Sequence, residues 1–103
     1  MSNGGTVVEF TAGIKVGPDE RYEIVRICGR GGMGVVYEAV DHGLDEPRKV
    51  AVKQLNKIIA QSPRFVTNVR REVGIARELR HPNIVGVYDY VNWRDEHLVI
   101  MEY

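Results

Sequence analysis

The chain has 103 residues, of which 44% are hydrophobic and 27% are charged, so it can form one ordinary globular domain at most. Fourteen basic residues balance fourteen acidic ones, so no excess of positive charge indicates nucleic-acid binding. The arginines between positions 70 and 80 are interleaved with Glu72 and Glu78, as on a solvated helix face. With one cysteine, no apolar run of about 18 residues and no secretory signal at its start, the sequence predicts a cytoplasmic protein without a membrane segment.

The first half of the chain predicts a short leader and a β-hairpin. Residues 1–20 are rich in Gly, Thr and Pro, and we expect a poorly ordered leader with room for one short strand. From Tyr22 the chain is rich in β-branched residues, and β character resumes over residues 35–40 after a glycine cluster. The cluster, Gly29 to Gly34, is therefore predicted to join two antiparallel strands.

The second half predicts three more strands and one helix. A polar turn over residues 41–48 leads to a strand over 49–55. Ser62 and Pro63 suit the start of a helix, and apolar residues then recur at helical spacing until His81 and Pro82 end it. Strands are expected over 84–91 and 97–103. This order predicts an α+β fold with a five-stranded antiparallel sheet and one main helix.

The glycine cluster is the first candidate for function. Residues 29–34 fit the pattern G-x-G-x-x-G, which is weak alone because the chain has 11 glycines. Such a cluster can be a flexible hairpin tip, or the start of the helix that holds a dinucleotide, or a lid over nucleotide phosphates between two strands. Because a strand former and not a helix follows Gly34, the dinucleotide-binding interpretation fails.

A lysine and a glutamate extend this pattern. Lys53 closes the third strand, 19 residues after Gly34; a lysine there is solvated unless the glycine cluster lies beside it. A lysine that holds phosphates needs an anion to position it, and Glu72 on the predicted helix is the better candidate. Glu78 competes with it, and either glutamate could instead pair with a neighbouring arginine at the surface.

Five segments together resemble a known family. They read CGRGGMGVVYEA over 28–39, VAVK over 50–53, RE at 71–72, HPNIV over 81–85 and LVIMEY over 98–103. In this order and spacing they resemble the eukaryotic-type Ser/Thr protein kinases of bacteria. The resemblance implies a kinase N-terminal lobe over residues 21–103, from a parent enzyme that transfers the γ-phosphate of ATP to Ser or Thr of proteins.

The resemblance also implies the role of each site residue, with Mg-ATP as the cofactor. The phosphates would lie under the hairpin and against a lysine–glutamate pair, and the adenine would lie beneath the sheet beside the hinge. The phosphate group is Gly29, Arg30, Gly31, Gly32, Met33, Gly34, Lys53 and Glu72. The adenine group is Val36 and Ala51 above the ring, Met101 as gatekeeper, and the Glu102 carbonyl as acceptor of the adenine amino group.

Two departures from the family limit what the chain is expected to do. Cys28 stands where the family usually has Leu, Ile or Val; a buried cysteine there would act as a small hydrophobe, whereas a partly exposed thiol would be a site for modification. No catalytic-loop or Mg²⁺-binding motif follows, and neither Asp89 nor Asp95 replaces one. We therefore expect no catalytic residue, no metal ligand and no protein phosphorylation from this chain alone. Its expected partners are ATP and either a protein substrate or the C-terminal lobe; the alternative is a non-catalytic interaction module.

Overall fold

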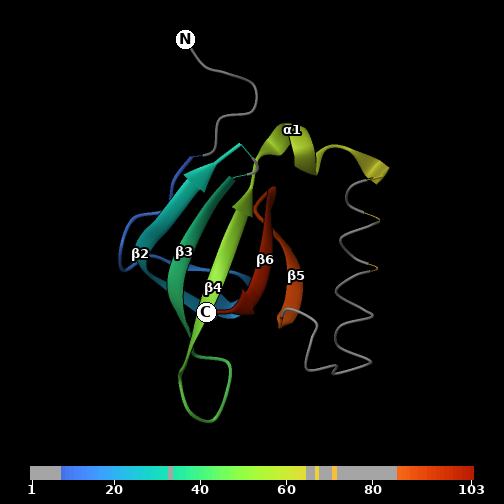
Figure 1. Ribbon diagram of the computed structural model, residues 1–103. Helices are drawn as coiled ribbons and strands as arrows, with labels where there is room; N and C mark the ends of the chain where they lie inside the picture. The colour runs from blue at the N-terminus through green and yellow to red at the C-terminus, as the bar shows by residue number, and fades with distance from the viewer. Residues whose placement is uncertain (1–7, 33, 65–66, 68–70, 72–85) are drawn as a thin grey trace.

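The computed structural model describes residues 8–32, 34–64, 67, 71 and 86–103 (Figure 1). Its strands form one antiparallel six-stranded sheet in the order β1-β2-β3-β4-β6-β5. The strands are β1 (Lys15–Val16), β2 (Tyr22–Gly31), β3 (Gly34–Asp41), β4 (Arg48–Leu55), β5 (Val87–Trp93) and β6 (Glu96–Glu102). The described helices are short: η1, a 3₁₀ helix (Pro18–Glu20), and α1 (Lys57–Ala60).

The predicted hairpin is present and longer than expected. β2 and β3 pair from Tyr22 opposite Asp41 up to Gly31 opposite Gly34. The sequence analysis treated 29–34 as a loop, whereas the structure pairs most of these glycines in the ladder. Backbone pairing needs no side chain, so a glycine cluster can continue a strand as well as end it.

The remaining strands confirm the prediction, with differences at the ends. β4, β5 and β6 begin within about three residues of their expected starts, a normal uncertainty for element boundaries. The sheet has six strands instead of five because β1 pairs with β2, as the leader's one short strand. Helix α1 was not expected; the side-chain oxygen of Asn56 caps it by accepting a hydrogen bond from the Ile58 N–H at 2.8 Å. The predicted helix over 62–80 lies mostly outside the described residues and stays a prediction.

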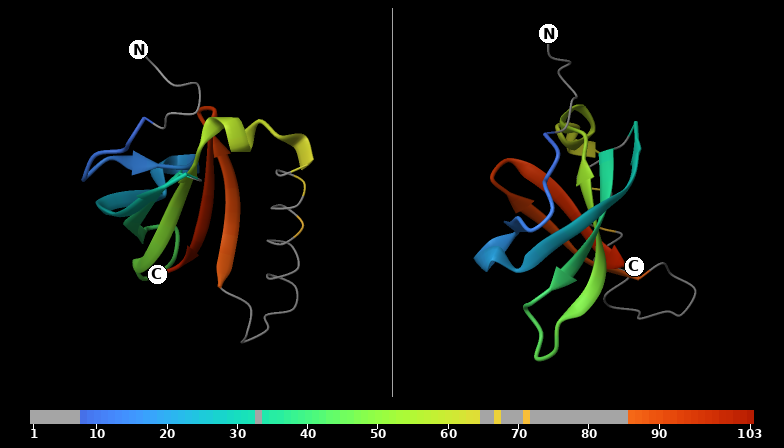
Figure 2. Two further views of the ribbon diagram at one scale, coloured as in Figure 1. Left: turned by 45° about the horizontal axis from the view of Figure 1, so that its top comes forward. Right: turned by 90° about the vertical axis from the view of Figure 1, so that its left-hand side faces the viewer.

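The sheet curls around one main core on one of its faces (Figure 2). Burial alternates along β3, where Tyr37, Ala39 and Asp41 are buried and the residues between them are only half-buried. This period of two is that of a strand with one face in a core. The core cluster lies on the Tyr37 side: Val16, Tyr22, Ile24, Val35, Tyr37, Ala39, Val50, Val52, Val91, Leu98 and Ile100.

Candidate functional site

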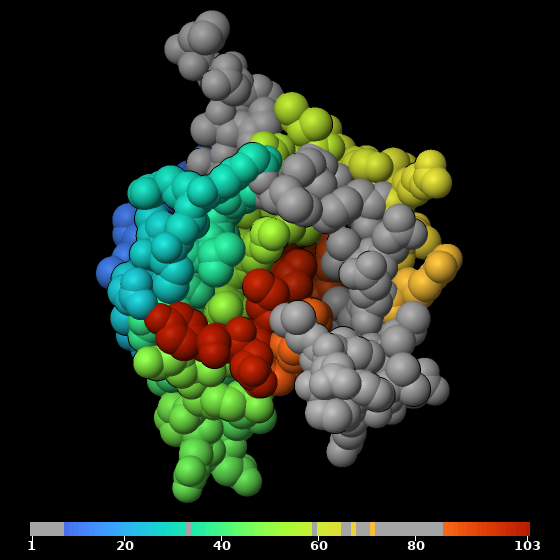
Figure 3. All heavy atoms as spheres, in the orientation of Figure 1, coloured from blue at the N-terminus to red at the C-terminus, as the bar shows by residue number. Residues whose placement is uncertain are grey.

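The other face of the sheet carries most of the predicted site. Across the strands, Gly29 lies opposite Val36, Val36 opposite Lys53, and Lys53 opposite Val99. Directly opposed residues share a face, so the register aligns the glycine hairpin, Val36 and Lys53 in one row. Figure 3 shows the hairpin (cyan) and the end of β6 (red) bordering the same side of the molecule.

A hollow of about 330 Å³ lies under the hairpin in this row. Its size falls at the small end of ligand pockets. The lining combines glycine backbone, one apolar side chain and lysine: Gly29, Arg30, Gly31, Gly32, Gly34, Val36 and Lys53. The structure thus brings together seven of the residues that the sequence analysis assigned to the nucleotide.

The glycines of the hairpin differ in whether the surrounding structure leaves room for a side chain. Gly34 has φ +145°, and a Cβ there would lie 1.9 Å from the backbone oxygen of Gln54. At Gly29, Gly31 and Gly32 a Cβ would meet nothing within 4 Å, and none of them has a positive φ in the left-handed region. Gly34 is therefore required by the packing of β3 on β4. Within the described residues, the other three are not crowded, which leaves their backbone open to a ligand.

Of the predicted adenine residues, Val36 lies in the row of Lys53, and Ala51 and Met101 lie one row further along the same face. Ala51 pairs with Met101 on one side and with Glu38 on the other. Ala51 is buried and Met101 is half-buried. Glu102, the next residue of β6, is exposed, and its backbone N–H donates to the Gly86 carbonyl at 2.6 Å. That these residues line an adenine pocket stays a prediction.

A polar cluster that the sequence analysis missed borders this end of the face. Arg26 donates through Nε to Glu38 Oε1 at 2.8 Å and through Nη2 to the Tyr103 hydroxyl at 2.5 Å. Lys49 Nζ lies 3.8 Å from Glu38 Oε2 and 4.9 Å from the centre of the Tyr103 ring. The hydrogen bond with Glu38 raises the pKa of Arg26. This cluster ties the end of β6 to β2 and β3 beside Met101.

Two predicted site residues lie outside the described residues, Met33 and Glu72. Their positions stay predictions, as does the pairing of Lys53 with Glu72. Among the residues that the structure does describe, no carboxylate forms an ion pair with Lys53. Glu72, the better candidate for its counter-ion, and the competing Glu78 both lie outside the described residues.

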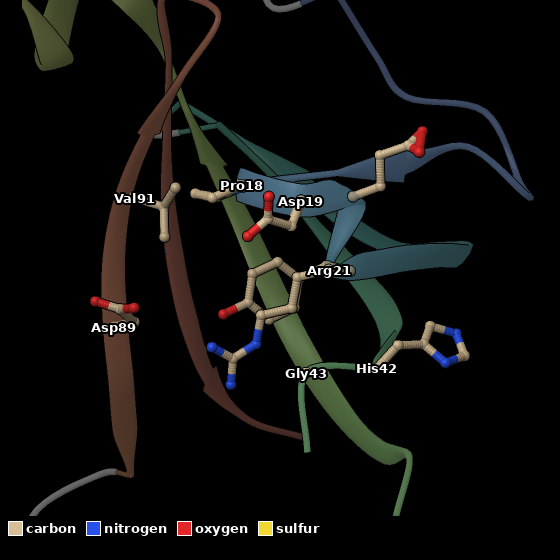
Figure 4. Close-up of a pocket in the computed structure, with 9 residues that line it drawn as sticks. Pro18, Asp19, Arg21, His42, Gly43, Asp89 and Val91 are labelled. Atoms are coloured by element: carbon tan, nitrogen blue, oxygen red, sulfur yellow. The ribbon is translucent and has the colours of Figure 1, made fainter. Parts of the chain in front are cut away.

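A second hollow, of about 370 Å³, lies at the far end of β2 and β3 (Figure 4). Its arginine, Arg21, is already committed to Asp41 through two hydrogen bonds of 2.7 and 3.0 Å. Burial alone would raise the pKa of Asp41, but hydrogen bonds from Arg21 and the Gly43 N–H outweigh it and lower the pKa. Asp89 of β5 lines the opposite side of this hollow. A hollow whose cation is paired in this way is poorly suited to a phosphate.

The described residues form neither a metal-binding cluster nor a membrane-spanning helix. No three His, Cys, Asp or Glu side chains of residues 8–32, 34–64 and 86–103 come together in a way that could hold a metal ion. No helix in that part of the chain is long and apolar enough to cross a membrane. Of the two hollows, the one under the glycine hairpin is the better candidate for a phosphate, because the arginine of the other already pairs with Asp41.

Comparison with known proteins identifies the family. The family model described as the protein kinase domain matches residues 22–103 of the sequence. Over 83 residues the chain is 45% identical to the serine/threonine-protein kinase PrkC of Bacillus subtilis, covering 81% of this chain and 12% of that protein. It is 43% identical to the serine/threonine-protein kinase PknD of Chlamydia pneumoniae, covering 82% of this chain and 9% of that protein.

Solved structures agree with the sequence matches. A crystal structure of a double mutant of the PknI kinase domain of Mycobacterium tuberculosis superposes with a TM-score of 0.77 at 28% identity, covering 93% of this chain and 37% of that one. The chain therefore spans about an eighth or less of these two curated relatives and about a third of the solved domain. On the strength of the match over residues 22–103, the chain belongs to the protein kinase family and has the fold of its N-terminal lobe.

Proposed function

We propose that this lobe binds ATP on the Lys53 face of the sheet, as part of an enzyme that phosphorylates Ser or Thr of proteins. The observation that carries the proposal is the hollow under the hairpin, where uncrowded glycine backbone and a lysine line one space. Phosphate oxygens are bound by backbone N–H donors and a cation at close range, and the lining combines glycine backbone with a lysine.

Each part of the proposed site has a distinct task. The backbone of Gly29, Gly31 and Gly32 would approach the phosphates from above, and Lys53 would neutralise the α- and β-phosphates. Val36 and Ala51 would cover the adenine, with Met101 behind it and the Glu102 carbonyl as its acceptor. Mg²⁺, when bound, would neutralise further phosphate charge. The proposal assigns no metal ligand and no catalytic base to this chain.

Glu72 has a positioning task in this proposal. A lysine side chain with four rotatable bonds loses about 2 kcal/mol of rotamer freedom when it is fixed. A glutamate on the predicted helix would hold the lysine in place before the nucleotide arrives and so lower the cost of ordering it. We also place the reaction in the cytoplasm, since ATP is supplied there and a single free cysteine suits a reducing compartment.

The alternative of a non-catalytic interaction module finds less support. Such a module would present a contiguous apolar patch to its partner. The large apolar side chains exposed in the described part of the chain come from separate elements: Val8, Ile14, Val25, Leu44, Ile58 and Tyr103. No single surface follows from these six, so the nucleotide proposal is preferred.

A thermal melt with and without Mg-ATP tests the proposal. At about 100 times its dissociation constant, ATP would stabilise the folded chain by about 2.7 kcal/mol and raise the melting temperature. Lys53→Ala should lose most of this rise because its positive charge in the hollow is gone. Lys15→Ala makes the same charge change on the exposed strand β1, far from the hollow, and should keep the rise. If ATP shifts neither the parent chain nor Lys15→Ala, the proposal is wrong.

A further inference from the structure

The face of the sheet opposite the hollow is crossed by an N-terminal strap, which we define as Val8, Glu9 and Phe10 (Figure 2). The ring of Phe10 packs on the core side of the sheet, with its centre 5.3 Å from that of Tyr37 and 6.2 Å from that of Trp93. The strap thus lies behind the strands whose other faces carry Val36 and Lys53.

Hydrogen bonds to two buried side chains fasten the strap to β3 and β4. The Phe10 N–H donates to the Tyr37 hydroxyl at 2.9 Å, and that hydroxyl donates to Gln54 Oε1 at 2.6 Å. Gln54 Nε2 in turn donates to the Val8 carbonyl at 2.9 Å and to Glu96 Oε1 at 3.0 Å. Tyr37 and Gln54 are fully buried, and a buried amide that lost these partners would be destabilising. The strap is therefore part of the folded core.

The strap also reaches the glycine hairpin itself. Glu9 forms a bidentate ion pair with Arg30, with Nε to Oε2 at 2.6 Å and Nη2 to Oε1 at 3.0 Å. The hydrogen bonds of this pair lower the pKa of Glu9 and raise that of Arg30. Among the described residues of the cluster 29–34, Arg30 alone is not a glycine. It is thus the side chain by which this part of the hairpin can be held.

We infer that the strap positions the glycine hairpin, through the Glu9–Arg30 pair, for the nucleotide site under it. This inference rests on the proposed function. Tyr37 and Gln54 hold the backbone of the strap on both sides of Glu9, so this glutamate can restrain the glycine-rich strand through Arg30. A restrained hairpin loses less freedom when it closes on phosphates, and nucleotide affinity rises accordingly. The strap would thus raise the affinity for the nucleotide although it lies on the other face of the sheet.

The experiment measures amide hydrogen exchange of residues 29–32 by NMR, first without nucleotide. Glu9→Gln should speed exchange there roughly two- to five-fold, since an exposed ion pair restrains only modestly. Glu46→Gln makes the same charge change in the exposed β3–β4 loop, at the opposite end of β3, and should leave exchange unchanged. Glu9→Lys combined with Arg30→Glu rebuilds the pair with exchanged charges and should restore the slow exchange. Unchanged exchange in Glu9→Gln, or no rescue by the exchanged pair, would overturn the inference.

A titration with Mg-ATP then tests the link to the nucleotide. Glu9→Gln should weaken binding about two- to five-fold, with the melting temperature of the free chain kept, and Glu46→Gln should bind as the parent does. Equal affinity of Glu9→Gln and the parent would refute the link. If the parent itself binds no ATP, the proposed function fails and this link fails with it, whereas the exchange data still decide whether the strap positions the hairpin.

Discussion

Gly34 is the position where the packing of the glycine hairpin on β4 can be tested most directly. A Cβ at this residue would lie 1.9 Å from the Gln54 backbone oxygen, 2.9 Å from its carbon and 3.1 Å from Leu55 Cα. Ordinary contact begins at 3.4 Å, so the Gln54 carbonyl would have to move by about 1.5 Å, well beyond the few tenths of an ångström that a tight contact can yield. All three obstructing atoms belong to the backbone, and no side chain can turn away to make room.

The loss of stability expected for Gly34→Ala has two contributions. Placing alanine at φ +145° strains the backbone by about 1–3 kcal/mol. Displacing β4 adds an overpacking term of about 1–3 kcal/mol, and it disturbs the buried Gln54 side chain that bonds Tyr37 and Glu96. Gly34→Ala should therefore lower the free energy of unfolding by about 3 kcal/mol or more, a large part of what a small domain has.

The matched comparison is Gly31→Ala. No atom lies within 4 Å of a Cβ there, so the free energy of unfolding should change by less than about 0.5 kcal/mol. Affinity for Mg-ATP should nevertheless fall, because the added methyl group stands between the backbone and the phosphates. Urea unfolding followed by the fluorescence of Trp93, the chain's one tryptophan, measures stability, and a nucleotide titration measures binding.

Two results would refute this reasoning. If Gly34→Ala unfolds at the same urea concentration as Gly31→Ala, β3 does not approach β4 as the register Gly34 opposite Leu55 requires. If Gly31→Ala binds Mg-ATP as tightly as the parent chain, the hollow under the hairpin backbone is not where the phosphates lie.

Two pH effects follow from buried groups on the core side. The pKa of Asp41 is lowered below its usual 3.8. The ionised Asp41 therefore stabilises the fold fully above pH 3.8, and this stabilisation is lost as the pH falls below 3.8. In Asp41→Asn, the free energy of unfolding measured with urea should depend less on pH in this acid range. Burial raises the pKa of Tyr22 from 10.0 to about 12, so stability should fall by about 2 kcal/mol as the pH rises from 10 to 12, where the unfolded chain ionises first. Tyr22→Phe should lack this fall, and a Tyr22→Phe variant as alkali-sensitive as the parent would contradict it.

The strands and the hairpin could be predicted from sequence because local signals agree there. β-branched and aromatic residues recur over 22–27 and 35–40, and a polar turn separates the second run from Val50 and Val52 in 49–55. The glycine cluster between the first two of these runs predicts a hairpin, and the position of Lys53 on the third strand then follows. The alignment of Gly29, Val36 and Lys53 in one row is the structural counterpart of these signals.

Other features depend on register or on very short elements. β1 has two residues and α1 has four, too few for any period to show; only the Asn56 cap marks the helix. The Arg26–Glu38 pair could not be predicted from the sequence, because the pairing of β2 with β3 is irregular on both sides of Arg26. Counting back from Gly31 opposite Gly34 without those irregularities would set Glu38 against Ile27 instead.

β4 is the element through which the two faces of the sheet can influence each other. Lys53 and Gln54 are neighbours in the chain, and the pleat points their side chains to opposite faces. Gln54 is held by Tyr37, Glu96 and the Val8 carbonyl of the strap, and its own carbonyl is the atom against which Gly34 packs. If our inference holds, a shift of the strap would act through Gln54 on both the tip of the glycine hairpin at Gly34 and the adjoining backbone of Lys53. Gln54 is thus the residue that contacts the strap, packs against the hairpin and adjoins the lysine.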